Sequence, residues 1–293
     1  MSISTSFLVL GGTGQIGREL CRHLAPSAPV LAPPRHVLDL ADLGAVAAYI
    51  RANQPSVIFN AAAMTAVDLA EREPVAAYRL NAELPGVIGE SAARIGAGVV
   101  HYSSDYVFNG MSDTPYLESD EAVPLNVYGA TKLAGERALS ATKAMSLTFR
   151  TSWVYGAQGS NFALTVRRKL SEGERLRVVD DQHGAPTWSR LIATESARCA
   201  ALLGSDADLW HDRGGIYHLT ASGETTWYGF ASALGVIFYP DGNRPSIEPI
   251  TSNEFRAAAR RPRNSLLNSD RVERAFGVRM PSWQEQLGQA FSP

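Results

Sequence analysis

Short apolar runs alternate with amphipathic stretches along the first half of the chain. The runs are rich in β-branched residues and predict buried strands at 7–10, 30–32, 57–60, 99–103 and 146–150. The stretches between them carry apolar residues three and four positions apart and predict helices at 15–24, 42–53, 81–96 and 128–142. This alternation is typical of βαβ units, which build a parallel sheet covered by helices.

The second half of the chain has a less regular pattern, in which turn-rich segments such as 180–186 and 240–245 interrupt the apolar runs. A chain of 293 residues is long enough for two domains. We therefore predict an α/β fold with a doubly wound parallel sheet in residues 1–152 and a smaller C-terminal α/β domain in residues 153–293. No long linker separates them, so some later segments are expected to pack back onto the first domain.

Composition and charge exclude several classes of protein. The net charge of −2 and the pI near 6.3 argue against a broad nucleic-acid-binding surface. Cys21 and Cys199 fall in apolar helical patterns, which favours buried free thiols over a disulfide. Residues 1–6 have no basic character, and no later stretch is long and apolar enough to anchor the chain in a membrane. The expected compartment is the cytoplasm.

A glycine-rich turn follows the first strand and opens the first helix. Its glycines, Gly11, Gly14 and Gly17, are spaced by three, and Gln15 and Ile16 begin the helix. Such a turn lets the backbone approach a pyrophosphate, and the helix N-terminus presents free N–H groups to it. The pattern predicts a Rossmann-like dinucleotide-binding unit, with a purely structural turn as the alternative.

The end of the second strand indicates which dinucleotide binds. An acidic residue there suits the ribose of NAD, whereas a basic one suits the 2′-phosphate of NADP. The chain has Arg35 and no acid at this point, which favours NADPH over NADH, although Arg35 is also consistent with a solvated loop. Asp39 and Leu40 are expected near the adenine, with an N-cap of the next helix as the alternative for Asp39. Three small residues, Ala61, Ala62 and Ala63, follow the third strand and would let a flat cofactor lie close to the backbone. The alternative is that they let helices pack closely.

Two further segments carry candidate catalytic groups. Ser104 and Asp105 end a buried strand, and ligands of doubly wound sheets lie at the carboxyl ends of the strands, although a simple strand-end turn is the alternative. Tyr128 and Lys132 are one helical turn apart and share a face, so the amine is placed to favour the phenolate. Only three of the 27 basic residues are Lys, which favours a specific role for Lys132.

These motifs, in this order, resemble the extended short-chain dehydrogenases/reductases and, more narrowly, the dTDP-4-dehydrorhamnose reductases. The narrower resemblance covers nearly the whole chain. It rests on residues 61–68, 124–129, 149–155, 161–163, 180–187 and 261–265. It implies hydride transfer from NADPH to C4 of dTDP-4-dehydro-β-L-rhamnose, the last step in making dTDP-L-rhamnose for cell-surface polysaccharides. The smaller domain would then bind the nucleotide sugar.

The resemblance also implies roles for individual residues. Tyr128 would be the proton donor, Lys132 would favour its phenolate and bond the nicotinamide ribose, and Ser104 would orient the carbonyl or adjust the tyrosine. Asp105 and Trp153 would touch the substrate, with a turn cap and an interdomain core position as their alternatives. The weaker substrate candidates are Val67, Asn161, Gln182 and Arg261. Arg261 belongs to a basic run that is also typical of a solvated helix face.

Two departures from the family pattern limit what carries over. Some members dimerise through Mg²⁺ held by interface carboxylates, and the chain has Glu19 at one matching position but Arg190 at the other. A cation site lined by Arg is unfavourable, so we predict no metal site, and the chain is a monomer or a homodimer. Ser104 replaces the common Thr and keeps its hydroxyl. The competing hypotheses are a regulatory subunit of the methionine adenosyltransferase type and an epimerase or reductase of another nucleotide sugar.

Overall fold

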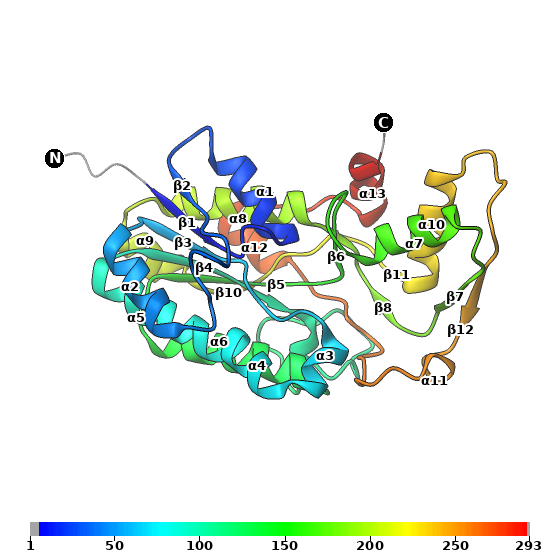
Figure 1. Cartoon of the computed structure of the whole chain (residues 1–293), viewed down its shortest axis with the longest axis horizontal. Helices are drawn as coiled ribbons and strands as arrows, with labels where there is room; N and C mark the ends of the chain where they lie inside the picture. The colour runs from blue at the N-terminus through cyan, green and yellow to red at the C-terminus, as the bar shows by residue number, and fades with distance from the viewer. Residues whose placement is uncertain (1–5, 292–293) are drawn as a thin grey trace.

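A six-stranded parallel sheet forms the centre of the structure, a computed structural model that describes residues 6–291 (Figure 1). The strand order is β10-β5-β4-β3-β1-β2, so the chain leaves β1 toward one edge and then returns to its other side. The strands are β1 (Phe7–Leu10), β2 (Val30–Leu31), β3 (Val57–Asn60), β4 (Gly98–Ser104), β5 (Ser146–Thr151) and β10 (Gly215–His218). This order confirms the predicted doubly wound α/β fold.

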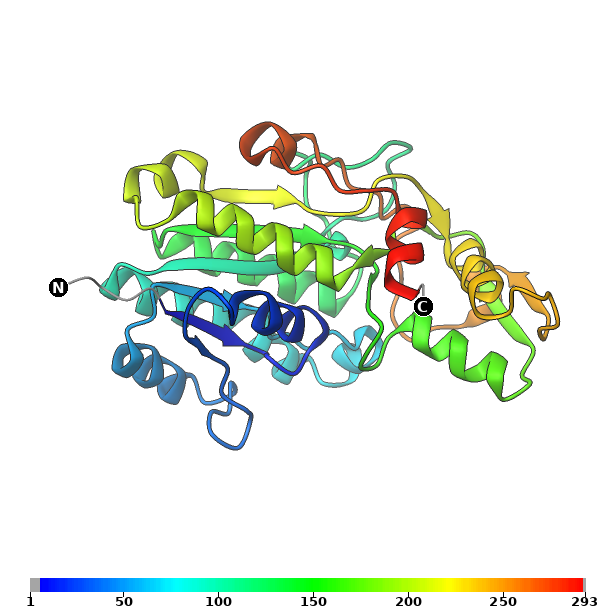
Figure 2. The ribbon, with the colours of Figure 1, turned by 90° about the horizontal axis from the view of Figure 1, so that it is seen from above.

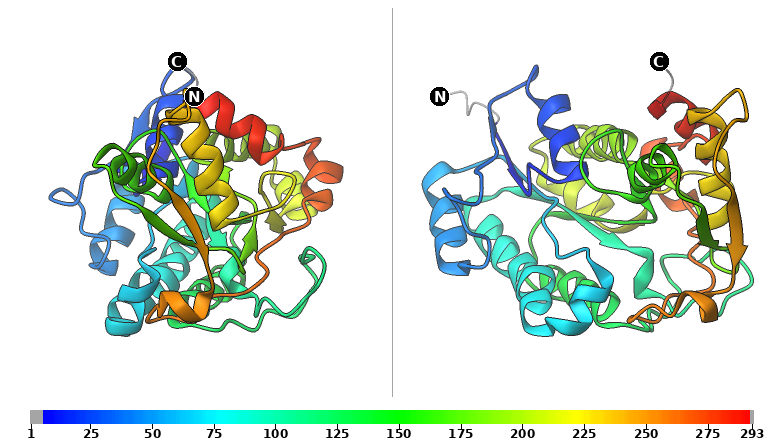
Figure 3. Two further views of the ribbon diagram at one scale, coloured as in Figure 1. Left: turned by 90° about the vertical axis from the view of Figure 1, so that its right-hand side faces the viewer. Right: turned by 45° about the vertical axis from the view of Figure 1, so that its right-hand side comes forward.

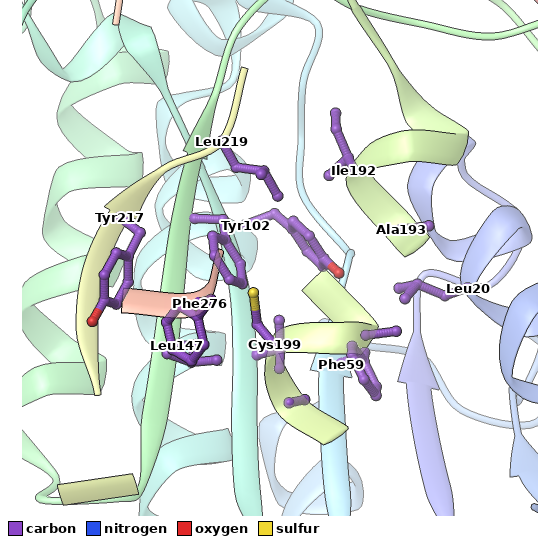
Figure 4. Close-up of a cluster of buried hydrophobic side chains, with 14 of the residues drawn as sticks. Leu20, Phe59, Tyr102, Leu147, Ile192, Ala193, Cys199, Tyr217, Leu219 and Phe276 are labelled. Carbon is purple, nitrogen blue, oxygen red and sulfur yellow. The ribbon is translucent and has the colours of Figure 1, made fainter. Parts of the chain in front are cut away.

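Helices cover both faces of this sheet. One face is covered by α2 (Leu43–Asn53), α5 (Leu84–Ile95) and α6 (Val127–Ala141), and the other by α1 (Gln15–Leu24), α8 (Ser189–Leu203) and α12 (Asp270–Phe276). Buried side chains of α8, among them Ile192 and Cys199, pack on Phe59, Tyr102 and Leu147 of the sheet (Figure 4). Each face therefore has a separate apolar core.

The predicted elements of the first half are confirmed to within three residues at each end, with one exception. The first three residues of the helix expected at 81–96 belong instead to a π-helical segment, η1 (Arg79–Glu83), which follows α4 (Pro74–Tyr78). Pro85 lacks the N–H that would bond to the carbonyl of Asn81 in an α-helix, which explains the wider turn at this point. A short helix, α3 (Val67–Arg72), was also not predicted.

The later part of the chain contributes to both halves of the molecule. Strand β10 forms one edge of the large sheet beside β5, and α8 packs on α1 (Figure 2). This packing was expected for some later segments. The domain boundary at residue 152 stays a prediction. Residues 1–5, on which the expectation of no export signal partly rests, lie outside the described residues.

The smaller lobe lies beyond one end of the sheet and has its own apolar core (Figure 3). It contains three strand pairs, two of them parallel and that of β8 with β11 antiparallel. The pairs are β6 (Val154–Tyr155) with β9 (Thr187–Trp188), β7 (Leu176–Val179) with β12 (Ile247–Ile250) and β8 (His183–Gly184) with β11 (Thr225–Thr226). Its helices are α7 (Phe162–Ser171), α10 (Trp227–Phe238), α11 (Ser252–Phe255) and α13 (Trp283–Phe291).

Other expectations concern the cysteines and the membrane. Cys199 is buried, Cys21 is half-buried, and both are free thiols. In the described part of the chain, no helix combines the length and the apolar character that crossing a bilayer requires.

The remaining elements are α9 (Ala207–Arg213) and a 3-10 turn, η2 (Asp105–Val107).

Helix α6 lies so close to η1 that only glycine fits at position 135. A Cβ on Gly135 would lie 2.0 Å from the carbonyl oxygen of Asn81. We expect Gly135→Ala to lower the free energy of unfolding by about 1–3 kcal/mol, because the two backbones must move apart. Chemical denaturation measures the change. The control is Gly86→Ala in α5, where the added methyl meets the Ala138 side chain at 3.4 Å. The control is expected to keep or raise stability, and equal losses in both variants would contradict the explanation.

Candidate active site

A cleft of about 710 Å³ opens at the carboxyl ends of the sheet strands, where the smaller lobe meets the sheet. Its walls come from the turn after β1, the ends of β3, β4 and β5, helix α6 and the smaller lobe. The predicted site residues that line it are Gly14, Gln15, Ile16, Ala61, Ala62, Ala63, Val67, Ser104, Asp105, Tyr128, Lys132, Trp153, Asn161 and Arg261. Segments predicted separately from the sequence thus meet in one place.

A second cleft of about 320 Å³ adjoins the first along the glycine-rich turn, because both are lined by Thr13, Gly14 and the three alanines after β3. The predicted residues that line only this second cleft are Gly11, Arg35, Asp39 and Leu40. Together the two clefts form a continuous path from the end of β2 to Tyr128 and Lys132. An extended dinucleotide requires such a path.

The glycine-rich turn leaves its backbone accessible to a ligand. Gly14 is the N-cap of helix α1 and offers no side-chain cap, so the N–H groups of the first helical turn are free to bind a phosphate. Gly17 lines neither cleft and acts by packing, since a Cβ there would lie 2.1 Å from the carbonyl oxygen of Gly11. These features fit the pyrophosphate of a dinucleotide.

Arg35 lies at the rim of the second cleft with an 88% exposed side chain, 3.9 Å from Asp39. Its guanidinium is therefore available to an arriving ligand. The alternative for Asp39 as the N-cap of the next helix is wrong. Asp42 caps α2 instead, because its side chain accepts the N–H of Ala45 at 2.9 Å.

Helix α6 positions Tyr128 and Lys132. Asn126 caps the helix by accepting the N–H of Gly129 at 2.8 Å. One turn apart, Tyr128 is 9% exposed and Lys132 only 1%. The ammonium of Lys132 donates to the backbone carbonyl of Tyr102 on β4, at 2.6 Å, which fixes the helix against the sheet.

Burial is the main cause of the pKa shifts of both Tyr128 and Lys132. It raises the pKa of the Tyr128 phenol to about 12, a shift that the hydrogen bond with Ser104 opposes and Asp105 increases. Burial lowers the pKa of Lys132 to about 8, and the nearby carboxylate of Glu136 opposes that shift. At neutral pH the phenol is therefore protonated, and most molecules carry Lys132 as an ammonium.

Ser104 and Asp105 form a buried network beside Tyr128. The Ser104 hydroxyl donates to Asp105 at 2.8 Å, and Ser152 donates to the other carboxylate oxygen at 3.1 Å. Ser265 adds a further hydrogen bond. Burial raises the pKa of Asp105 to about 6, although the serine hydrogen bonds lower it. The Ser104 hydroxyl also accepts the N–H of Tyr106 at 3.1 Å and hydrogen-bonds with the Tyr128 phenol, so it links Asp105 to Tyr128.

Trp153 packs against two residues of the smaller lobe. Trp227 stacks on one face with ring centres 3.7 Å apart, and Gly184 lies against the same indole. Trp153 thus has a core contact, one of its two alternatives, yet it also lines the cleft. Asn161 caps α7 through the N–H of Leu164 and reaches the cleft as well.

Of the two substrate candidates Arg261 and Gln182, only Arg261 lines the large cleft. Arg261 forms an ion pair with Asp68 at 2.8 Å and lines the cleft from an irregular segment, so the alternative of a solvated helix face is wrong. Gln182 does not line either cleft, and its amide donates to Ser252 at 2.8 Å.

Several residues that line the large cleft were not predicted, among them Thr65, Tyr106, Phe162 and Trp227. Tyr106 is adjacent to a predicted residue, and its ring packs edge-on against Tyr128 with ring centres 5.7 Å apart. Trp227 begins α10, where Thr226 provides an N-cap, but this local signal does not indicate contact with Trp153. Such contacts depend on how the lobe packs.

The two positions considered for a metal site pair with each other. Arg190 contacts Glu19 at 3.2 Å. Within residues 6–291 there is no group of three or more His, Cys, Asp or Glu residues arranged to hold a metal ion. The absence of a metal-dependent dimer stays a prediction.

Comparison with known proteins gives consistent similarities. The RmlD substrate binding domain family matches residues 5–293. The dTDP-4-dehydrorhamnose reductase of Escherichia coli strain K12 is 43% identical, covering 95% of this chain and 94% of that protein. That of Burkholderia thailandensis is 41% identical and covers 96% of both. The crystal structure of the Bacillus anthracis dTDP-4-dehydrorhamnose reductase in complex with NADP superposes with a TM-score of 0.89 at 30% identity and covers 99% of both chains.

The burial of Asp105 predicts a pH-dependent stability. Its pKa in the folded protein, about 6, lies above the ordinary value of 3.8, so the folded state binds more protons between these values. The contribution of Asp105 to the free energy of unfolding therefore falls as pH rises from 4 to 6. We expect the melting temperature of Asp105→Asn, relative to wild type, to increase over this range. Calorimetry at several pH values tests this, and a constant difference would contradict the buried charge.

Proposed function

This chain belongs to the family of the dTDP-4-dehydrorhamnose reductases, and on that premise we propose that it reduces the C4 ketone of dTDP-4-dehydro-β-L-rhamnose with NADPH, giving dTDP-β-L-rhamnose. Membership of the family makes it an NAD(P)H-dependent oxidoreductase. One observation carries the proposal: Tyr128, Lys132 and Ser104 line the same cleft as the glycine-rich turn.

The proposed cofactor site follows the two adjoining clefts. The free N–H groups at the start of α1 would bind the pyrophosphate, and Arg35 would bind the 2′-phosphate that distinguishes NADPH from NADH. Asp39 and Leu40 would contact the adenosine, while Ala61, Ala62 and Ala63 would lie under the flat rings. When bound, NADPH supplies the hydride.

The protein supplies the proton. Hydride addition to a ketone leaves a negative oxygen, which Tyr128 would protonate from its phenol. The high pKa of Tyr128 keeps that proton in place before reaction. Lys132 is placed by the Tyr102 carbonyl so that its other N–H groups are free for the ribose and the phenolate that forms. Ser104 would adjust the pKa of Tyr128 through the hydrogen bond between them.

The proposed substrate contacts come from both lobes. Asp105 would accept a hydrogen bond from a sugar hydroxyl. Arg261, which is held by its ion pair with Asp68, would place a positive charge near the diphosphate. Val67, Trp153 and Asn161 would complete the wall of the cleft. No substrate contact is proposed for Gln182, because it lines neither cleft and instead donates to Ser252, which also bonds to Asp181.

The direct test is an assay with purified protein, dTDP-4-dehydro-β-L-rhamnose and either reduced cofactor. We expect NADPH oxidation, with a lower KM for NADPH than for NADH because Arg35 is available for the 2′-phosphate. The control substrate is dTDP-glucose, which has no C4 ketone and should give no oxidation. Turnover only with another nucleotide ketosugar would favour the other reductase hypothesis. No turnover, with tight binding to a methionine adenosyltransferase subunit, would favour the regulatory one.

The proton-donor role of Tyr128 predicts a kinetic effect. Tyr128→Phe is expected to lower kcat by about 10²-fold or more while leaving NADPH affinity nearly unchanged, because only the transferred proton is lost. Steady-state kinetics and NADPH fluorescence titration measure the two quantities. The matched control is Tyr116→Phe, which removes a hydroxyl bonded to Asn109 away from the cleft and should leave kcat within about twofold. A normal kcat in Tyr128→Phe would exclude Tyr128 as the donor.

A further inference from the structure

Helix α6 carries a third buried titratable group, Glu136, one turn beyond Lys132. Tyr128, Lys132 and Glu136 follow each other at intervals of four and therefore share one face of the helix. Glu136 is 3% exposed and accepts two hydrogen bonds from Arg150, at 2.7 and 2.9 Å. Neither Glu136 nor Arg150 lines the large cleft, so neither touches a ligand there.

Arg150 belongs to β5 and is itself 3% exposed. It pairs in register with Ser103 of β4, the residue after Tyr102, whose carbonyl accepts the Lys132 ammonium. The Arg150 guanidinium also lies over the Phe108 ring at 5.0 Å. Three buried charges of alternating sign, Lys132, Glu136 and Arg150, thus form a row that leads away from the cleft.

A buried ion pair of this kind is weak evidence for stability. Removing two charges from water costs several kcal/mol per ion, and an apolar pair of similar volume is often as stable. The position of the carboxylate beside Lys132 indicates a different use. A negative group one helical turn away favours an ammonium over a neutral amine.

We propose that Glu136 is a positioning residue that keeps the buried Lys132 in its ammonium form, and that Arg150 limits the strength of this effect. This inference rests on the proposed function, because it assumes that Lys132 acts as an ammonium at the cofactor and at Tyr128. Glu136 would act through Lys132 without touching the reacting atoms.

The other charged and titratable groups around Lys132 are compatible with this role. On β4, His101 is buried, and burial and Lys132 itself hold its pKa well below its usual range, so it adds no charge. Tyr128, Tyr102 and Tyr106 stay neutral at neutral pH because burial raises their pKa values. Asp105 acts on the phenols of Tyr106 and Tyr128.

The remaining charges near α6 are either paired or distant from Lys132. In α5 and η1, the pairs Arg94–Glu90 and Arg79–Glu83 are exposed. In α3, Asp68 binds Arg261, and Glu71 accepts the N–H of Val127 at the start of α6. Beside Arg150, burial lowers the pKa of His218 to about 3, so it is neutral. On α6 itself, Arg137 is exposed. Within the described residues, Glu136 is the carboxylate that shifts the pKa of Lys132.

The test compares the alkaline limb of the pH profile of kcat/KM in four proteins. Activity requires the Lys132 ammonium and falls as pH rises through its pKa of about 8. Glu136→Gln should move this limb to lower pH by about one unit or more, because the stabilising charge is lost. Arg150→Met should move it to higher pH, because the carboxylate is no longer neutralised. A structural role alone would lower activity or stability in both variants without opposite shifts.

The double variant Glu136→Gln/Arg150→Met keeps the test decisive if the single variants do not fold. Replacing both partners of a buried pair is tolerated better than replacing one. Its limb should lie between those of Glu136→Gln and wild type, since Glu136, one helical turn from Lys132, is the charge that acts on the Lys132 pKa directly, whereas Arg150 lies on β5. The control is Glu172→Gln, which removes an exposed carboxylate paired with Arg168 and should leave the limb in place.

A second measurement separates failure of this inference from failure of the proposed function. The affinity for NADPH, measured by fluorescence titration across the same pH range, should show the same order of shifts without any sugar substrate. A wild-type protein that does not reduce the ketosugar would overturn the proposed function alone. A folded double variant whose kinetic limb and NADPH titration both match wild type would overturn the role of Glu136.

Discussion

The hydrogen bond between the buried Lys132 ammonium and the Tyr102 carbonyl is the interaction on which the site depends. A charge without a partner would be very costly at 1% exposure, so helix α6 has to lie directly against β4. The close approach of Gly135 to Asn81 permits this position, and the Asn126 cap fixes where the helix begins. The phenol of Tyr128 then lies beside the Ser104 hydroxyl at the end of the same strand.

The order of the strands explains why the cofactor and substrate candidates lie at one edge of the sheet. In a parallel sheet all carboxyl ends lie at one edge, and the reversal of direction at β1 leaves a crevice there. The first half of the chain contributes the glycine-rich turn and the catalytic candidates to this edge. The smaller lobe closes the same edge with Trp153, Trp227 and Arg261. Cofactor and substrate would therefore meet at the end of β4.

Burial sets the pKa values of the polar residues at this edge of the sheet. Burial raises the pKa of Tyr128 and Asp105 and lowers that of Lys132, because each charged form loses water. Neighbouring groups then adjust these shifts: serine hydroxyls for Asp105 and the Glu136 carboxylate for Lys132. Burial is the largest cause of each of these three shifts.

The sequence by itself determined the strands and helices of the first half, the glycine-rich turn and the pairing of Tyr128 with Lys132, because hydrophobic periodicity and helical spacing are local properties. It also indicated the family through motifs that span the chain. Only the tertiary structure decided that β10 completes the sheet, that Trp227 covers Trp153, that Asp68 holds Arg261 and that Arg150 pairs with Glu136. These residues are distant in the sequence or belong to different elements, and their contacts follow from packing, which no local pattern encodes.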